Sequence, residues 1–269
     1  MPHSLQIAKL TFRYPRSIRA AIHEFSLDVS AGHCCALLGS TGSGKSTLLH
    51  GIAGTLLRDY PGATVLGEMS LNGNRFDPLP PTVLFPAVGL VHQEASLMIS
   101  GMFESVVDEI SLSLQNLSLS HEEEEYRKRW VLHLLNIEHL EQRNPSQLSG
   151  GELRKVALAT ILVAKPKILL LDAPSVGLDQ RSQFELARLI QRLKGTTTVI
   201  FTESTVELAL LAAETIVVLD QGRCLFLGGR KSFLSHLGDF QHILPTEKWQ
   251  NLFRLLQTPS SIPLTKFVR

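Results

Sequence analysis

Residues 34–46 read CCALLGSTGSGKS, and this stretch decides the fold. Its first five residues are apolar, as in a buried strand, and residues 47–53 can continue as a helix. Between them, residues 39–46 fit the pattern G-x4-G-K-[ST]. In a strand–loop–helix unit, these glycines let backbone N–H groups surround phosphates at the positive end of the helix dipole.

The lysine and hydroxyl of this pattern indicate what the loop binds. Lys45 would reach the β- and γ-phosphates of a nucleotide, and the Ser46 hydroxyl would bind Mg²⁺. A glycine-rich turn without nucleotide is the alternative, but such a turn does not require both residues in this register. The pattern therefore predicts a nucleotide site that includes Gly39, Ser40, Thr41, Gly42, Ser43, Gly44, Lys45, Ser46 and Thr47.

A second glycine motif, LSGGE, occupies residues 148–152. Paired glycines permit close approach of the backbone, and Ser149 offers a hydroxyl and helix-start amides to an anion. Apolar residues then recur at a spacing of three and four up to residue 161, which predicts a helix. An ordinary N-cap with an acidic first turn is the alternative interpretation.

A third motif is the apolar strand 168–171, which ends at Asp172. With the other two motifs it resembles the ATP-binding cassette ATPases, and the resemblance covers residues 6–233. It implies that Asp172 holds Mg²⁺ through water. It also implies that the LSGGE residues face the γ-phosphate of ATP held by a second subunit: Leu148, Ser149, Gly150, Gly151 and Glu152.

Three further positions fit the same resemblance. Tyr14 would stack on adenine, although an ordinary edge-strand tyrosine remains the alternative. Gln93, at the end of the apolar strand 88–92, would touch Mg²⁺ or water and report on a membrane partner. Residues 175–179 would contact the opposite subunit. ATP and Mg²⁺ are thus the expected cofactors, and the expected metal contacts are Ser46, Gln93 and Asp172.

Two positions depart from the family pattern. The residue after Asp172 is Ala173, where the family has the glutamate that polarises the attacking water. The strand 197–202 is followed by Glu203, where the family usually has a histidine that contacts the γ-phosphate. A carboxylate about 4 Å from a phosphate charge costs on the order of 4 kcal/mol at an effective dielectric near 20, so it must swing away, protonate or find a cation.

These departures predict a degenerate site that binds ATP and hydrolyses it slowly, since a positioned base is worth about 10²–10⁴ in rate. Two alternatives stay open. Glu203 could replace the missing base, because it is a carboxylate close to the right place. An engineered exchange of glutamate for alanine at position 173 is the other alternative.

The order of the expected elements predicts an α/β fold with a mostly parallel sheet, an N-terminal antiparallel β portion and an inserted helical subdomain. The nucleotide-binding domain would span residues 1–240, its helical subdomain about 94–157, and a C-terminal tail 241–269. Residues 78–81 read as a loop, and residues 103–117 and 120–137 read as helices. In the second helix, Ser120 and Glu123 predict a capping box, and Glu123 and Arg127 predict a pair at i,i+4.

Composition favours a cytosolic subunit that meets the membrane through partners. The 269 residues carry a net charge of +1, which gives no sign of a nucleic-acid-binding patch. The three cysteines show no metal-ligand spacing and suit a reducing compartment. We find no apolar signal segment and no stretch of the ~20 apolar residues that a membrane span needs. The expected location is the cytoplasmic face of the cell membrane.

Within the family, residues 105–110, 114–120 and 165–167 resemble the ATPases of energy-coupling factor importers. That resemblance implies a second ATPase subunit and a transmembrane coupling or permease protein as partners. The first functional hypothesis is therefore an importer subunit, the degenerate half of a heterodimer whose LSGGE motif completes the partner's active site. The alternative is a nucleotide-gated scaffold or switch in a complex that does not transport.

Overall fold

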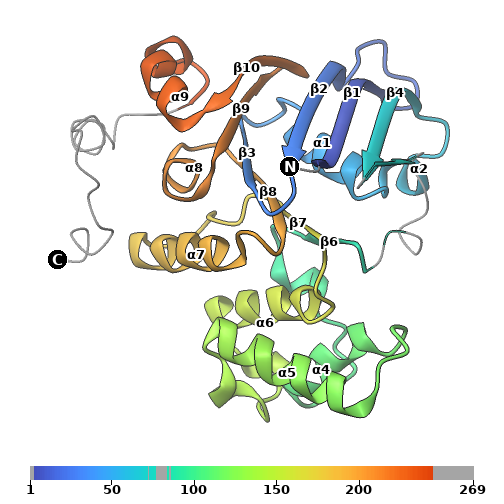
Figure 1. Cartoon of the computed structure of the whole chain (residues 1–269), viewed down its shortest axis with the longest axis vertical. Helices are drawn as coiled ribbons and strands as arrows, with labels where there is room; N and C mark the ends of the chain where they lie inside the picture. Colours follow the sequence, from blue (N-terminus) through green and yellow to red (C-terminus); the bar gives the residue numbers. More distant parts are fainter. Residues whose placement is uncertain (1–2, 72, 77–83, 85, 245–269) are drawn as a thin grey trace.

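The computed structural model describes residues 3–71, 73–76, 84 and 86–244. The loop expected at 78–81 and nearly all of the tail expected at 241–269 lie outside these residues. The described chain forms two sheets and a group of helices set apart from them (Figure 1). None of its helices is both long and apolar enough to cross a bilayer.

The smaller sheet confirms the expected N-terminal antiparallel portion. Its strand order is β2-β1-β4-β5, and every neighbouring pair is antiparallel. In β2, apolar residues at every second position are buried, as in a sheet with one face on the core. The strands are β1 (His3–Arg13), β2 (Ile22–Ser30), β4 (Thr64–Leu71) and β5 (Asn74–Phe76).

The larger sheet has the order β10-β9-β3-β8-β7-β6 and is parallel except for β10. Two of its central strands, β3 and β7, are apolar throughout because both faces of the sheet are covered. This sheet confirms the expected mostly parallel α/β fold. Its strands are β3 (Cys34–Leu38), β6 (Val88–Val91), β7 (Ile168–Leu171), β8 (Thr198–Glu203), β9 (Thr215–Asp220) and β10 (Arg223–Gly229).

Alternate residues of β3 belong to different halves of the core. Cys35 and Leu37 pack with α1 (Lys45–Ile52), α2 (Leu56–Asp59) and the smaller sheet. Ala36 and Leu38 pack on the opposite face with α7 (Gln180–Leu193), α8 (Glu207–Ala212) and α9 (Arg230–His236). The strand that leads into the phosphate-binding loop is therefore fixed from both sides.

The strand order also decides which loops meet. Strands β3, β8 and β7 are parallel neighbours, so their carboxyl ends lie at one edge of the sheet. The phosphate-binding loop follows β3, Glu203 ends β8, and Asp172 follows β7. Ligands bind at this edge in open α/β sheets, which makes it the candidate site.

The inserted helices lie to one side of the larger sheet, in the lower part of Figure 1. They are α4 (Val106–Ser111), α5 (His121–Leu135) and α6 (Gly150–Leu162). The helix expected at 103–117 is shorter than predicted, because the Ser105 hydroxyl accepts from the Asp108 N–H and so starts α4 there. A 3₁₀ turn, Leu112–Leu114, follows directly after it.

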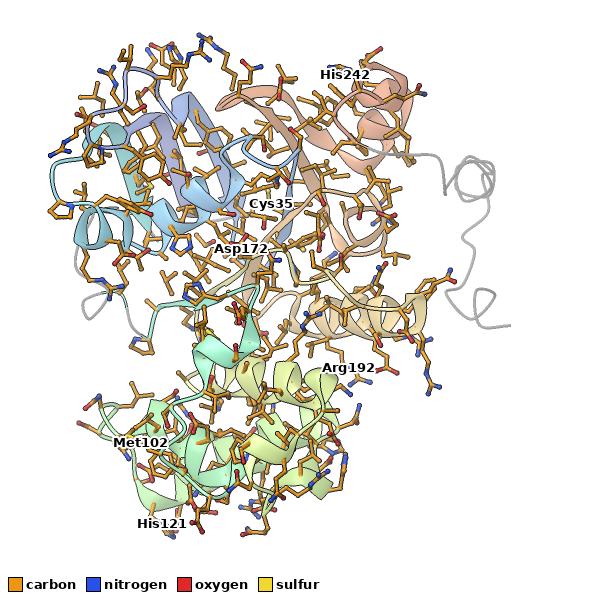
Figure 2. The ribbon with its side chains drawn as sticks, turned by 180° about the vertical axis from the view of Figure 1, so that it is seen from behind. Cys35, Met102, His121, Asp172, Arg192 and His242 are labelled. Carbon is orange, nitrogen blue, oxygen red and sulfur yellow. The ribbon has the colours of Figure 1, made fainter. Side chains whose placement is uncertain are left out.

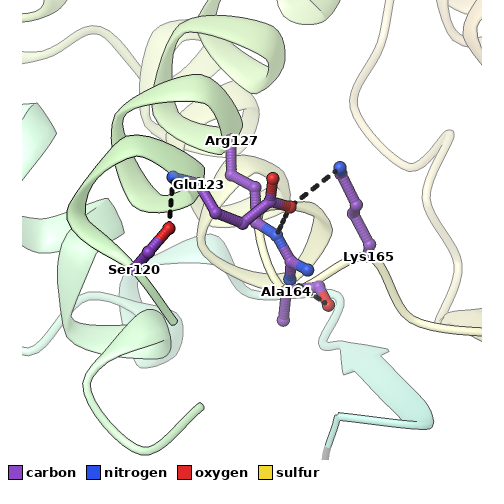
Figure 3. Close-up of polar contacts among 5 residues, drawn as sticks. All are labelled: Ser120, Glu123, Arg127, Ala164 and Lys165. Carbon is purple, nitrogen blue, oxygen red and sulfur yellow. Dashed lines mark hydrogen bonds and ion pairs between the residues drawn. The ribbon is translucent and has the colours of Figure 1, made fainter. Parts of the chain in front are cut away.

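Helix α5 begins as expected at Ser120, whose hydroxyl accepts from the Glu123 N–H at 3.3 Å (Figure 3). The Glu123 carboxylate, however, accepts from Arg127 Nε at 2.6 Å and Lys165 Nζ at 3.3 Å. The predicted capping box is therefore wrong, because two cations attract this carboxylate more strongly than one backbone amide. The predicted Glu123–Arg127 pair is confirmed. Arg127 also donates to the Ala164 carbonyl, which ties α5 to the turn between α6 and β7.

Candidate functional site

The phosphate-binding loop has the backbone that its glycines predict. Gly39, Gly42 and Gly44 all have positive φ, at 156°, 82° and 103°. A Cβ at Gly39 would lie 2.3 Å from the Leu219 carbonyl oxygen, and one at Gly44 would lie 2.6 Å from the Ala21 carbonyl oxygen. Only glycine fits this close approach, so the loop conformation follows from the sequence. Gly44 precedes α1 without a side-chain cap, so the helix start presents free N–H groups to an anion.

Lys45 lies across this loop. Its Nζ donates to the carbonyl oxygens of Gly39 and Ser40, both at 2.8 Å. Burial lowers the pKa of this ammonium group, while the charges of Asp172 and Glu203 act in the opposite direction. The charged group is thus held among loop carbonyls, where it can turn to a phosphate.

Asp172 meets the loop from β7. Ser46 Oγ donates to Asp172 Oδ1 at 3.1 Å, although the two residues are far apart in sequence. Thr202 Oγ1, from β8, donates to the same Oδ1 at 2.6 Å. Figure 2 labels Asp172 between the helical insertion and the rest of the molecule. A hydroxyl and a carboxylate in contact are hard oxygen donors of the kind that Mg²⁺ prefers, so these residues fit that ion.

The protein offers this ion few ligands of its own. Among the described residues, we find no group of three or more His, Cys, Asp or Glu side chains that could hold a metal. Mg²⁺ ordinarily keeps several waters and binds one or two carboxylates together with substrate phosphates. The pair Ser46 and Asp172 suits an ion that arrives with a nucleotide.

Ala173 directly follows this carboxylate. Its φ is 44°, which is unusual for a residue other than glycine, and its N–H donates to Thr202 Oγ1 at 2.8 Å. Its carbonyl oxygen accepts from the Val176 N–H at 3.2 Å. The backbone here is fixed on both sides, but the side chain is a methyl group that cannot accept a proton.

Glu203 is buried, with 1% of its surface exposed. Its Oε1 accepts from the Ser175 N–H at 2.8 Å, and its carbonyl oxygen accepts from the Gly39 N–H at 3.2 Å. Burial raises the pKa of this carboxyl to about 7, with a smaller contribution from Glu207, while Ser175 and Lys45 lower it. Glu203 therefore joins the phosphate-binding loop to residues 175–179, with its carboxylate turned toward a backbone amide.

Tyr14 lies beside the first turn of α1. Its hydroxyl is 2.8 Å from Thr47 Oγ1, and the half-buried ring makes edge contacts with Phe12 and Tyr60 at centroid distances of 4.9 and 4.8 Å. The structure thus brings the predicted Tyr14 to the predicted loop residue Thr47. Tyr60, which is 43% exposed, is an aromatic neighbour that sequence reasoning missed. In the sequence, no motif marks Tyr60 as part of this site.

Gln93 is exposed and lines a cavity of about 570 Å³ that Asp172 also lines. Gly151 and Glu152 line the same cavity, so part of the LSGGE motif shares it with these residues. Ser149 caps α6 in a capping box. Its N–H donates to Glu152 Oε2 at 2.8 Å, and its Oγ accepts from the Glu152 N–H at 3.4 Å. The Ser149 hydroxyl, which also donates to Glu152 Oε2 at 2.7 Å, and the Ser149 N–H lower the pKa of Glu152.

Gly150 and Gly151 differ from the loop glycines. A Cβ at either position would meet nothing within 4 Å, and neither has a positive φ. Both are exposed at the start of α6. Among the described residues, neither packing nor backbone conformation requires a glycine there.

Comparison with known proteins matches residues 22–176 to the family described as ABC transporter. The chain belongs to this family. It is 37% identical to an energy-coupling factor transporter ATP-binding protein, EcfA2, of Streptococcus sanguinis over 77% of this chain and 74% of that protein. It is 35% identical to the cobalt import ATP-binding protein CbiO of Rhodobacter capsulatus over 84% of this chain and 79% of that protein.

Solved structures confirm the ABC ATPase fold. The structure of cbiO1 of Clostridium perfringens, described as part of the ABC transporter complex cbiONQ, covers 96% of this chain with a TM-score of 0.79 and 24% identity. The expected fold class and the resemblance to ATP-binding cassette proteins of the energy-coupling factor type are thus confirmed. As an ABC transporter ATP-binding chain, the protein binds ATP.

Proposed function

We propose that this chain is the ATP-binding subunit of an importer of the energy-coupling factor type, and that it is the hydrolytically degenerate half of a heterodimer. The observation that carries the proposal is Ala173, a methyl group held directly after the Mg²⁺-binding carboxylate. The phosphate-binding loop, Lys45, Ser46 and Asp172 supply binding. Without a base beside Asp172, the site lacks general-base catalysis, which typically raises the reaction rate by about 10²–10⁴-fold.

In this proposal each residue has a defined task. The loop N–H groups and Lys45 bind the phosphates, Ser46 and Asp172 hold Mg²⁺, and Gln93 contacts the ion or its water. Tyr14 stacks on the base. When bound, Mg²⁺ supplies charge neutralisation at the β- and γ-phosphates.

The LSGGE motif supports the heterodimer. No contact in the described part of the chain requires Gly150 and Gly151 to be glycine, which suggests that another molecule approaches their backbone. Ser149 and Glu152 cap the start of α6, and the exposed Gly150 and Gly151 lie in its first turn. The positive end of the helix dipole at these glycines suits an anion such as the γ-phosphate of a partner-bound nucleotide. We infer that Ser149 and Gly150 serve catalysis on the partner subunit, while the chain's own loop retains ATP.

The relatives support the remaining parts of the proposal, which are the role in transport and the location at the membrane. Proteins named for energy-coupling factor transport and cobalt import share more than 30% identity with this chain over most of its length. We therefore place residues 1–240 in the ATP-binding domain, with residues 94–157 as its helical subdomain. The domain would lie at the cytoplasmic face of the membrane and bind a transmembrane coupling protein. A nucleotide-gated switch outside transport is the second candidate, favoured by the absent base at Ala173.

The test uses the purified chain. We expect MgATP to raise its thermal unfolding midpoint, with phosphate release close to background, and Lys45→Ala to abolish the stabilisation. Robust turnover by the isolated chain that is lost in Lys45→Ala would overturn the degenerate site. Copurification from native membranes separates the two candidate functions, because an importer subunit must bring a membrane-spanning protein with it.

A further inference from the structure

Thr202 is a fully buried polar residue at the nucleotide end of β8, with 0% of its surface exposed. The hydroxyl donates to Asp172 Oδ1 at 2.6 Å and accepts from the Ala173 N–H at 2.8 Å. One side chain therefore holds both the carboxylate and the backbone that follows it. Buried hydroxyls are normally hydrogen-bonded, so these bonds alone could serve only to satisfy the hydroxyl.

The placement of the two bonds indicates that they do more than satisfy the hydrogen-bonding capacity of the Thr202 hydroxyl. A carboxylate at the end of a strand can rotate about two side-chain bonds. Thr202 and Ser46 both donate to Oδ1, and Oδ2 takes part in neither bond. The bond to Ala173 holds the backbone at the point where it turns to positive φ. Thr202, from β8, thus helps to determine how the Asp172 carboxylate is oriented.

We propose that Thr202 is a positioning residue for magnesium binding, because its hydroxyl fixes the Asp172 carboxylate toward Ser46. The inference rests on the proposed MgATP site and deepens it. In this proposal Thr202 acts through Asp172. Partners that orient a metal ligand typically contribute about 10–100-fold to metal affinity.

The experiment compares ATP affinity in excess Mg²⁺ with ATP affinity in EDTA, using a fluorescent ATP analogue and the full chain. Thr202→Val removes the hydroxyl with nearly unchanged shape, Thr202→Ala removes it with a smaller side chain, and Thr202→Ser keeps it. We expect the valine and alanine variants to lose about tenfold in MgATP affinity. Their affinity in EDTA should stay within about twofold of the wild type, and Thr202→Ser should restore the Mg²⁺ effect.

A matched control lies in the same strand. Thr198 is also buried, and its hydroxyl contacts Ser4 Oγ at 2.8 Å and accepts from the Gly32 N–H at 2.9 Å. Thr198→Val loses the same number of bonds away from Asp172, so it should lower stability without changing the Mg²⁺ effect. Equal losses with and without Mg²⁺ in Thr202→Val, or an unchanged Mg²⁺ effect, would show a structural role only. A wild type that gains no affinity from Mg²⁺ would instead overturn the proposed MgATP site.

Discussion

Glu203→Gln should make the protein more stable at alkaline pH and change little near pH 5. The carboxyl is buried and its pKa is raised to about 7, compared with its ordinary value of 4.5 in the unfolded chain. A raised folded-state pKa means that the bound proton contributes stability in full below pH 4.5. That contribution is lost as the pH rises through 7.

The size of this effect on the unfolding free energy follows from the pKa shift of Glu203. A difference of one pKa unit corresponds to 1.36 kcal/mol, so complete ionisation of Glu203 costs about 3 kcal/mol of unfolding free energy. Glutamine has no proton to lose, and its amide oxygen can still accept from the Ser175 N–H. The difference in unfolding free energy between Glu203→Gln and the wild type should therefore grow by about 2.5 kcal/mol between pH 5 and pH 8.

Urea unfolding of the nucleotide-free protein at half-unit pH steps measures this difference. The charged groups that act on Glu203 are Glu207, which raises its pKa, and Lys45, which lowers it. Glu207→Gln is the matched control: it removes the nearby carboxylate and should move the loss of stability to lower pH. Parallel stability curves for wild type and Glu203→Gln from pH 5 to pH 8 would refute the reasoning.

Three further predictions concern the site. Ala173→Glu should raise the rate of phosphate release by less than about 10²-fold, the contribution of a well-placed base, because Glu203 remains beside the phosphate-binding loop. A rate still at background would show that the site lacks more than the base. Gly44→Ala should abolish MgATP binding and lower the unfolding free energy by about 1–3 kcal/mol, since its Cβ meets the Ala21 carbonyl oxygen at 2.6 Å. Gly42 also has a positive φ, but a Cβ there would meet open space, so the matched Gly42→Ala should cost only about 1 kcal/mol in urea unfolding. Tyr14→Ala should weaken ATP binding by about 1–3 kcal/mol in a titration and Tyr14→Phe by much less, because we propose that stacking, and not the bond to Thr47, holds the base. Equal losses would reverse that assignment.

The sequence predicted those parts of the site that are local in the chain. The phosphate-binding loop is determined by glycines with positive φ, of which Gly39 and Gly44 also make contacts too close for a Cβ. The meeting of Asp172 with Ser46 could also be expected, because parallel strands end at one edge of the sheet. Both inferences needed only the sequence motifs, the spacing of apolar residues and the expectation of a parallel sheet.

Other features depended on neighbours that the sequence does not reveal. Glu203 was expected near the phosphate, and its turn toward the Ser175 amide depends on the conformation of residues 175–179. Glu123 was expected to close a capping box, and Lys165, from a turn distant in sequence, attracts its carboxylate instead. Thr202 gave no signal beyond a hydroxyl at the end of an apolar strand.

The ATPase rate of the native complex carrying single substitutions in this chain tests the central claim most directly. Ser149→Arg should abolish ATP hydrolysis by the whole complex, because we propose that this motif completes the active site of the partner. Lys45→Ala should reduce the rate less severely, because in the same proposal the chain's own loop retains ATP without hydrolysing it. The opposite ranking, or full activity in a complex that contains only copies of this chain, would contradict the account.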